Sequence, residues 1–209
     1  MKELLDYYKR IKGEIKNRLR DFRENYRKDD REIFSELCFC ILTPQSDAVE
    51  CDKAIKRLKE RGLLFSGSKA QISPHIKAAR FLNNKAQYLV EARSIFKNNG
   101  SFCVKPHINR KYIFQTREWL VDNVKGIGYK EASHFLRNIG LGEDIAILDT
   151  HILKNLKKYR VIKEISKSMT RKRYMDIEDR MRKFADRIRI PMAELDLLFW
   201  SKETGVVFK

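Results

Sequence analysis

Two residues of this chain, a lysine and an aspartate, have the side chains and the setting to do covalent chemistry on a sugar. Lys130 ends the stretch VKGIGYK, residues 124–130, and Asp149 lies in LDTH, residues 148–151. A lysine amine that has lost its proton can attack a sugar C1′, displace the base and form a Schiff base with the opened deoxyribose. Elimination of the 3′ phosphate would follow. A carboxylate such as Asp149 would stabilise positive charge on the sugar and assist proton transfers.

The glycines of the same stretch predict the turn of a helix-hairpin-helix. Gly126 and Gly128 permit positive φ and a close backbone approach. Free N–H groups at the start of the second helix would then bind a phosphate. Taken alone, these features have ordinary explanations: a plain turn, a surface lysine at Lys130, and an N-cap at Asp149. Together with the basic composition described next, they favour chemistry on a nucleic acid.

The charge of the chain indicates an anionic partner. Lysine and arginine number 45 against 28 acidic residues, which gives a formal net charge of +17. That excess is more than solubility requires, and it favours nucleic acid over a membrane surface. No apolar run approaches the roughly 20 residues needed to cross a bilayer, and the N-terminus lacks the apolar core of a secretory signal. We expect a cytoplasmic, nucleoid-associated prokaryotic protein that works as a monomer.

The cysteines predict neither a metal centre nor a disulfide. The four are Cys38, Cys40, Cys51 and Cys103, with no CxxC pair and no histidine at a zinc-finger interval. Cys38 and Cys40 lie in the apolar segment IFSELCFCIL, where a cysteine is usually a small buried hydrophobe. We therefore expect free thiols, no iron–sulfur cluster and no required cofactor.

The elements that must position these residues are helices, so the predicted fold class is all-α. Nearly every segment has apolar residues spaced for one face of a helix, and almost none alternates as a strand does. Asp29 or Asp30 and then Asp47 are candidate N-caps, Thr43-Pro44 ends the first of these helices, and Gly62 ends the second. The expected helices span residues 30–42, 47–61, 73–96, 117–124, 129–138, 150–159 and 191–204.

The segment IAIL, residues 145–148, is apolar enough to be mistaken for a strand. We interpret it as a buried loop, because Asp149 follows it as an N-cap. In the helix after the glycine turn, we expect Lys130, Ser133, His134 and Arg137 on the face opposite the core. Two helical lobes are expected, residues 1–30 with 126–209 and residues 31–125, in one functional unit with approximate boundaries.

Three segments carry a resemblance to a known family. KGIGYKEA followed by LDTH resembles the signature of the helix-hairpin-helix DNA glycosylase superfamily, and ILTPQSDA, residues 41–48, resembles its helix–loop segment that enters the duplex. The ending ELDLLFWSKETGVVFK, without a C-terminal cysteine cluster, is similar to the archaeal-type 8-oxoguanine DNA glycosylase/AP lyase family. The resemblance runs from about residue 33 to the last residue, and it implies two helical lobes with a cleft between them.

This resemblance implies roles for the residues around the turn. Lys130 would be the nucleophile that forms the Schiff base, and Asp149 the carboxylate that assists cleavage. Gly126 and Gly128 would anchor a DNA phosphate. His151 would contact a phosphate near the lesion, although a surface histidine is the alternative.

Further residues are implied in recognition of the base. Gln45 would fill the space left by the flipped nucleotide, and Pro44 would stiffen its loop. Phe81 would wedge beside the unpaired opposite base, or it is a core residue. Trp200 would stack on the extruded base and Asp196, one turn earlier, would hydrogen-bond it; the alternatives are apolar packing and a solvated helix.

The resemblance also implies a role for the last residue and for one ion. Lys209 would help to recognise the damaged purine, whereas a frayed terminus is the alternative. Backbone carbonyls of Asp122, Val124 and Ile127 would hold a structural Na⁺ or K⁺. The chain departs from the endonuclease III branch, because it has no cluster-ligand set, and it has no room for the N-terminal β-sheet domain of the eukaryotic 8-oxoguanine enzymes.

The predicted function is therefore base-excision DNA repair by a bifunctional glycosidase and lyase. Such an enzyme would remove 8-oxoguanine from damaged duplex DNA and cut the strand by β-elimination. Two alternatives remain open: a glycosylase for other oxidised bases, and a helix-hairpin-helix protein that binds DNA without chemistry. Lys130 separates the second, because a binding module needs the glycines but not an amine with a carboxylate partner.

Overall fold

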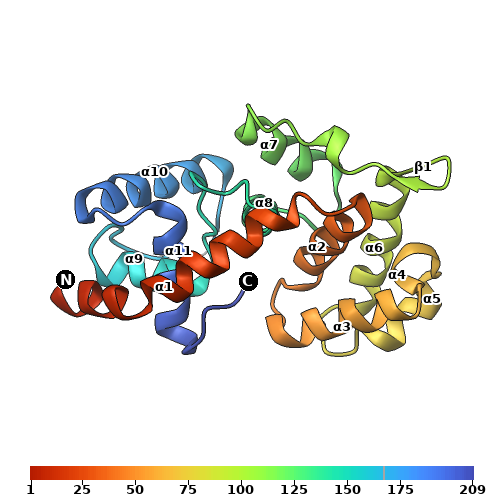
Figure 1. Cartoon of the computed structure of the whole chain (residues 1–209), viewed down its shortest axis with the longest axis horizontal. Coiled ribbons are helices and arrows are strands. Elements are labelled where there is room, and N and C mark those ends of the chain that lie inside the picture. The colour runs from red at the N-terminus through yellow and green to blue at the C-terminus, as the bar shows by residue number, and fades with distance from the viewer. Residues whose placement is uncertain (167) are drawn as a thin grey trace. The chain divides into compact units, whose positions relative to one another are not determined.

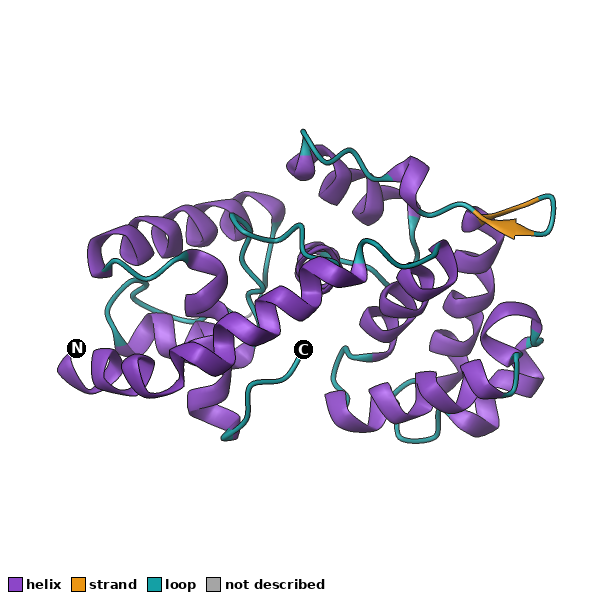
Figure 2. Cartoon of the chain, in the orientation of Figure 1, coloured by secondary structure: helices purple, strands orange, loops and turns teal. Residues whose placement is uncertain are grey.

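The chain is built almost entirely of helices, which confirms the all-α prediction (Figures 1 and 2). A computed structural model describes residues 1–166 and 168–209. The helices, in chain order, are α1 Lys2–Asn25, α2 Asp30–Leu42, α3 Ala48–Glu60, α4 Leu63–Ser66, α5 Lys69–Ile72, η1 Ser73–His75, α6 Leu82–Phe96, η2 Lys105–His107, α7 Ile113–Asn123, α8 Tyr129–Asn138, α9 Thr150–Lys158, α10 Arg171–Ile188 and α11 Met192–Thr204.

Within those described ranges, the strands form one short hairpin. Strands β1 Lys97–Asn98 and β2 Ser101–Phe102 pair antiparallel, with Asn98 opposite Ser101. Asn99 and Gly100 have φ values of 45° and 84°. An Asn-Gly pair with positive φ at both positions is the favoured two-residue connection of a hairpin. The turn expected around Gly100 is thus present, with a strand residue pair on each side.

The chain divides into two compact units, which we describe separately. The terminal unit contains Met1–Glu24 and Leu136–Lys209, and the central unit contains Asn25–Phe135. The boundary at which the chain returns to the terminal unit, between Phe135 and Leu136, falls inside α8. The boundaries expected from the sequence, at 30/31 and 125/126, follow the hairpin instead of these packing units, and that lobe assignment stays a prediction.

The core of the central unit forms around α2. Residues along α2 are buried on every side, among them Phe34, Leu37 and Phe39 at 0% exposure, and α2 packs against α3 and α6. The predicted caps are confirmed: Asp29 accepts a hydrogen bond from Glu32 N and Asp47 from Glu50 N, both at 2.9 Å. α2 and α3 are therefore fixed at their starts by local carboxylates, with residues 43–47 as a short connection.

The single helix expected from Ser73 to Phe96 is wrong. The segment is divided into η1, a turn and α6, because Phe81 has φ 59° and cannot continue a helix. Ile76 and Ala79 turn inward and are buried, and the Arg80 N–H donates to Ser46 Oγ at 2.9 Å. This bond joins residues 34 apart, so no local pattern could show it. As a result, Phe81 is 56% exposed.

The prediction that one face of α8 lies opposite the core is also wrong in part. Ser133, His134 and Arg137 are buried, with exposures of 0%, 6% and 6%. In the central unit, Arg117 Nη1 donates to Ser133 Oγ at 3.2 Å, and the His134 ring meets Phe39 edge-on at 5.5 Å. α8 is therefore buried along most of its length, and Ser133 and His134 contact other residues of the central unit.

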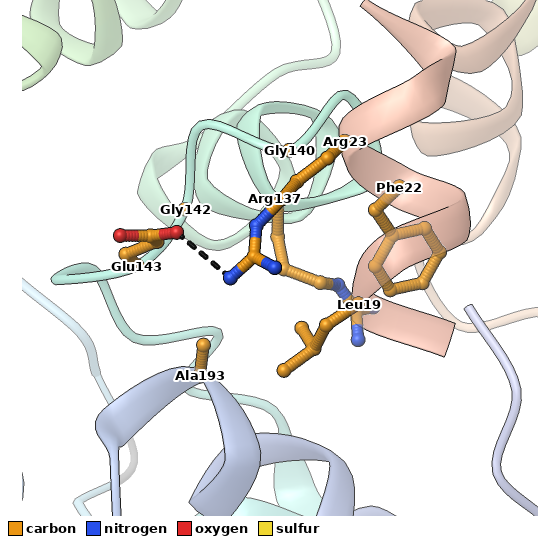
Figure 3. Close-up of a pocket in the computed structure, with 8 residues that line it drawn as sticks. All are labelled: Leu19, Phe22, Arg23, Arg137, Gly140, Gly142, Glu143 and Ala193. Carbon is orange, nitrogen blue, oxygen red and sulfur yellow. Dashed lines mark hydrogen bonds and ion pairs between the residues drawn. The ribbon is translucent and has the colours of Figure 1, made fainter. Parts of the chain in front are cut away.

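In the terminal unit, α11 is the most buried helix and packs against α9 and α10 (Figure 1). Arg137 pairs with Asp196 on α11 at 3.2 Å and lies over the Phe22 ring at 4.9 Å. A small cavity beside Arg137 is lined by Gly140 and by the ion-paired side chains of Arg23 and Glu143 (Figure 3). No helix in the described ranges is long and apolar enough to cross a membrane.

Candidate active site

The glycine turn between α7 and α8 forms as predicted. Val124 N donates to Leu120 O at 3.0 Å to close α7, and Ile127 N donates to Val124 O at 3.2 Å. Gly126 has φ 82°, and a Cβ there would lie 2.6 Å from Cδ2 of Tyr88. Both the backbone angle and the close approach of Tyr88 therefore require glycine.

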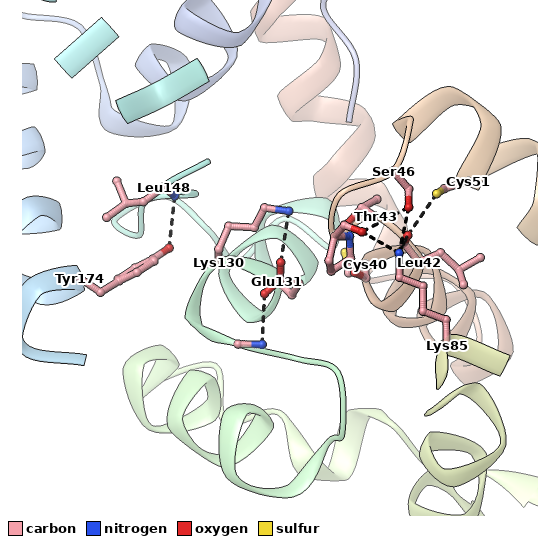
Figure 4. Close-up of polar contacts among 12 residues, drawn as sticks. Cys40, Leu42, Thr43, Ser46, Cys51, Lys85, Lys130, Glu131, Leu148 and Tyr174 are labelled. Carbon is pink, nitrogen blue, oxygen red and sulfur yellow. Dashed lines mark hydrogen bonds and ion pairs between the residues drawn. The ribbon is translucent and has the colours of Figure 1, made fainter. Parts of the chain in front are cut away.

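Lys130 emerges from the first turn of α8 beside an acidic neighbour (Figure 4). Its Nζ lies 3.3 Å from Oε1 of Glu131, and the two side chains are 24% and 15% exposed. The other oxygen, Oε2, accepts a hydrogen bond from Gly128 N at 3.1 Å. Glu131 thus caps the helix and holds the lysine at the same time.

Sequence reasoning missed Glu131, although a signal was present. With Gly128 as N-cap, Glu131 is the third helical residue, the position from which a Glu side chain reaches back to the N-cap N–H. The negative charge is also favourable at a helix N-terminus. The hydrogen bond to Glu131 occupies the Gly128 N–H, and Gly128 is one of the two glycines expected to anchor a phosphate.

Asp149 belongs to the terminal unit and begins α9. Its Oδ1 accepts from Ile152 N at 2.8 Å, so the predicted N-cap is confirmed. The preceding segment, residues 145–148, is buried and irregular, which confirms the predicted loop. This loop is held by α10: Tyr174 Oη donates to Ala146 O at 2.6 Å, and Glu178 accepts from Ala146 N at 2.7 Å. Asp149 is therefore fixed from both sides.

Aromatic rings gather near Asp149 in the same unit. The ring of His151 meets Trp200 edge-on at 6.4 Å, and Trp200 lies 6.2 Å from Phe208 at a tilt of 30°. Val207 is 7% exposed, and Lys209 is half-buried. Nδ1 of His151 is buried and has no hydrogen-bond partner among the described residues.

Asp196 differs from the rest of this group. It is 4% exposed and its Oδ2 is paired with Arg137, so the solvated-helix alternative is wrong. Its hydrogen bond to an extruded base stays a prediction, as do the DNA contacts of His151, Trp200 and Lys209.

The two residues expected to enter the duplex lie in the central unit, and both have left-handed backbones. Gln45 has φ 54° and Phe81 φ 59°, and both side chains are exposed. The core alternative for Phe81 is therefore wrong. Pro44 is half-buried beside Gln45. A second missed residue, Lys85, is 4% exposed and donates to the carbonyls of Leu42 and Pro44. A lone lysine in an amphipathic helix gives no signal of such a role.

Helices joined by a glycine turn, with a lysine in the first turn after it, place the chain in the class of helix-hairpin-helix proteins. The comparison with protein families is more specific. A family model described as 8-oxoguanine DNA glycosylase matches residues 15–190, and the chain belongs to this family.

Relatives along the whole chain agree with this family. A protein of Fusobacterium nucleatum, called 8-oxoguanine DNA glycosylase/AP lyase, is 45% identical over 209 residues, which cover 99% of this chain and 96% of the relative. One of Methanocaldococcus jannaschii with the same name is 39% identical, covering 95% of this chain and 93% of the relative.

Solved structures agree as well. The 8-oxoguanine DNA glycosylase of Thermotoga maritima superposes with a TM-score of 0.88 at 32% identity, covering 100% of this chain and 97% of the other. The Methanocaldococcus jannaschii 8-oxoguanine glycosylase/lyase, in complex with a 15mer DNA containing 8-oxoguanine, superposes with a TM-score of 0.86 at 34% identity and covers both chains fully.

Proposed function

We propose that this chain is a bifunctional DNA glycosylase and AP lyase that removes 8-oxoguanine from duplex DNA and then cuts the strand. The observation that carries the proposal is the position of Lys130, in the first turn after the glycine hairpin and in contact with Glu131. Relatives along the full chain bear the name of this activity. The enzyme would act as a monomer in base-excision repair in the cytoplasm.

In the first step, the neutral amine of Lys130 attacks C1′ of the damaged nucleotide and the bond from C1′ to the base breaks. The electron pair of that bond leaves with the base, which takes up a proton. The nitrogen, which now carries two protons, gives up one of them. Its electron pair then breaks the bond from C1′ to O4′, O4′ takes up a proton as the sugar ring opens, and a protonated Schiff base with one N–H forms. Glu131, 3.3 Å from Nζ, holds the amine in place and is an acceptor within reach of its proton.

In the second step, removal of a C2′ proton from the Schiff base expels the 3′ phosphate by β-elimination. Water then hydrolyses the Schiff base and frees Lys130. Asp149 is the carboxylate assigned to stabilise the cationic sugar and to assist these proton transfers. Its Oδ1 is used by Ile152 N, and Oδ2 accepts no hydrogen bond from the described residues.

Recognition of the base is assigned to the terminal unit. The face of Trp200 would stack on the extruded purine, with His151, Asp196 and Lys209 as polar partners for the base or a neighbouring phosphate. Ring stacking is tolerant of base identity. Selectivity for the oxidised purine would therefore rest on the polar groups.

DNA backbone contacts are assigned to the hairpin. The Gly126 turn presents backbone N–H groups to a phosphate. The carbonyls of Asp122, Val124 and Ile127 suit a monovalent cation: Val124 O accepts one bond and has a second lone pair, and Asp122 lies in the last turn of α7, where carbonyls lack helical partners. Asp122, Val124 and Ile127 also line a cavity of ≈ 540 Å³. A bound Na⁺ or K⁺ would supply positive charge for a phosphate.

Borohydride trapping tests this proposal directly. The wild-type chain should form a covalent adduct with a duplex that contains 8-oxoguanine, and Lys130→Gln should form none while it still binds the duplex. Lys125→Gln, at an exposed lysine of the same turn, is the matched control and should trap normally. A trapped adduct in Lys130→Gln, or none in the wild type, would disprove the mechanism.

A panel of duplexes separates the alternatives. We expect release of 8-oxoguanine to exceed release of oxidised pyrimidines and of other purines. If an oxidised pyrimidine is released fastest, the chain is a glycosylase for other bases. If no lesion is released but duplex DNA is bound, it is a binding module.

A further inference from the structure

We propose that Lys85 is a positioning residue for base extrusion, because it ties the loop that carries Gln45 to the turn that carries Phe81. We call residues 43–46 the Gln45 loop and residues 76–81 the Phe81 turn. This inference rests on the proposed function and adds to it a residue that acts before the chemistry. Lys85 would hold the two exposed side chains as one rigid wedge.

The ammonium group of Lys85 is fully used inside the protein (Figure 4). Nζ donates to Leu42 O at 2.6 Å, to Pro44 O at 2.7 Å and to Ser46 Oγ at 2.9 Å. An ammonium group has three donors, so each has an acceptor on the segment that contains Gln45. Pro44 O and Ser46 Oγ, on the two sides of Gln45, and the carbonyl of Leu42 at the end of α2 are thus held by one atom.

Ser46 connects the hydrogen bonds of Lys85 to the Phe81 turn. Its hydroxyl donates to Pro44 O at 3.2 Å and accepts from the backbone N–H of Arg80 at 2.9 Å. Lys85 itself lies in the first turn of α6, four residues after Phe81, and its N–H donates to Phe81 O at 3.1 Å. The network therefore reaches the backbone on both sides of the left-handed residue Phe81.

A packing role alone does not explain Lys85. Lys85 is 4% exposed and its acceptors are neutral oxygens. A buried charge without a carboxylate partner is unfavourable, and an apolar side chain would fill the site at lower cost. Burial lowers the pKa of Lys85, the charge of Lys130 acts in the same direction, and Cys51 and Glu131 oppose it. The three hydrogen bonds that Nζ makes to the loop explain a lysine at this buried position.

That shape is an unfavourable one. Gln45 and Phe81 are two of the five residues other than glycine with positive φ in the described ranges. Such backbone persists where surrounding contacts hold it, and it clusters at functional sites. Inserting side chains must offset the free energy of unstacking a base. A loop that is already ordered can insert its side chains without a further loss of conformational entropy on binding.

The test compares Lys85→Met with Lys56→Met. Methionine keeps an unbranched side chain and removes the three donors, while Lys56 is an exposed lysine of α3 paired with Asp52 at 2.8 Å. Amide hydrogen exchange should become faster in the Gln45 loop and the Phe81 turn of Lys85→Met, and it should stay as in the wild type in Lys56→Met. Unchanged exchange in Lys85→Met would overturn the tether, whatever the activity of the chain.

The second arm measures extrusion apart from chemistry. Single-turnover release of 8-oxoguanine from a duplex should slow by about tenfold or more in Lys85→Met, while strand cleavage at a preformed abasic site should change by less than about twofold, because a nucleotide without a base needs little unstacking. Placing the lesion in a short unpaired bubble should restore its release. Equal losses on both substrates, with no rescue, would assign Lys85 to the fold alone.

Ser46→Ala gives a second route if Lys85→Met does not fold. It removes the bond to Arg80 N and leaves the two carbonyl bonds of Lys85. Faster exchange confined to the Phe81 turn is expected, and unchanged exchange there would contradict the link. If the wild type releases no lesion, the proposed function fails, and the exchange measurements still decide the tether.

Discussion

Glu131 joins the hairpin turn to Lys130 through its two carboxylate oxygens. Oε2 accepts from Gly128 N at 3.1 Å, and Oε1 lies 3.3 Å from the ammonium nitrogen of Lys130. The backbone of the turn therefore sets the position of the amine through a single side chain. A glycine hairpin and a nucleophile that look like separate features in the sequence form one structural unit.

Replacing Glu131 should separate its two contacts. Glutamine also serves at this position of a capping box, so Glu131→Gln should keep the thermal stability of the wild type, whereas Glu131→Ala should lose about 1 kcal/mol in free energy of unfolding. Both should slow borohydride trapping by about tenfold, because a misplaced nucleophile reacts slowly. If Glu131→Gln traps at the wild-type rate, Glu131 is a cap only.

Gly126→Ala should destabilise the chain more than the same change at Gly100. Both glycines have positive φ, but an added Cβ meets Tyr88 at 2.6 Å at position 126 and nothing within 4 Å at position 100. Left-handed backbone costs alanine about 1 kcal/mol, and overpacking adds about 1–3 kcal/mol at Gly126. Urea unfolding measures both. Equal losses would show that Tyr88 moves aside freely.

Asp149→Asn should separate catalysis from helix capping. Asparagine caps helices as well as aspartate does, so the stability should change little, while release of 8-oxoguanine should fall by about 100-fold or more through loss of a carboxylate in proton transfer. Asp29→Asn, at the N-cap of α2 with the same bond to the third residue, is the matched control. Full activity in Asp149→Asn would exclude its assigned role.

Tyr174→Phe should reduce activity from a distance. The hydroxyl donates to Ala146 O and accepts from Leu148 N, and its loss leaves buried backbone groups of the loop before Asp149 without a partner. We expect a loss of about 1–3 kcal/mol in free energy of unfolding, with slower base release and nearly unchanged affinity for duplex DNA. Tyr112→Phe, at an exposed tyrosine, should change neither. Wild-type rates in Tyr174→Phe would mean that the loop needs no such support.

Local signals in the sequence determined the starts of α2, α3 and α9, whereas α1 and α10 were not among the expected helices. Asp29, Asp47 and Asp149 were recognisable as N-caps because each bonds an N–H three residues ahead, within the same few residues. The loop at 145–148 could be predicted because a short apolar run directly before an N-cap has no room for more helix. Lys130 and Asp149 stood out as candidates for the same reason: their chemistry and helix positions are local properties.

Only the tertiary structure decided how these residues are held. The break at Phe81 depends on the bond from Arg80 to Ser46, and the Gln45 loop on Lys85, which lies 41 residues from Pro44. The burial of Ser133, His134 and Arg137 depends on neighbours that surround α8. Periodicity reports which face of a helix is apolar, but it cannot report which distant polar groups will meet. Such contacts form only when the chain is packed, and that is why the support of the site was hidden while its reactive residues were visible.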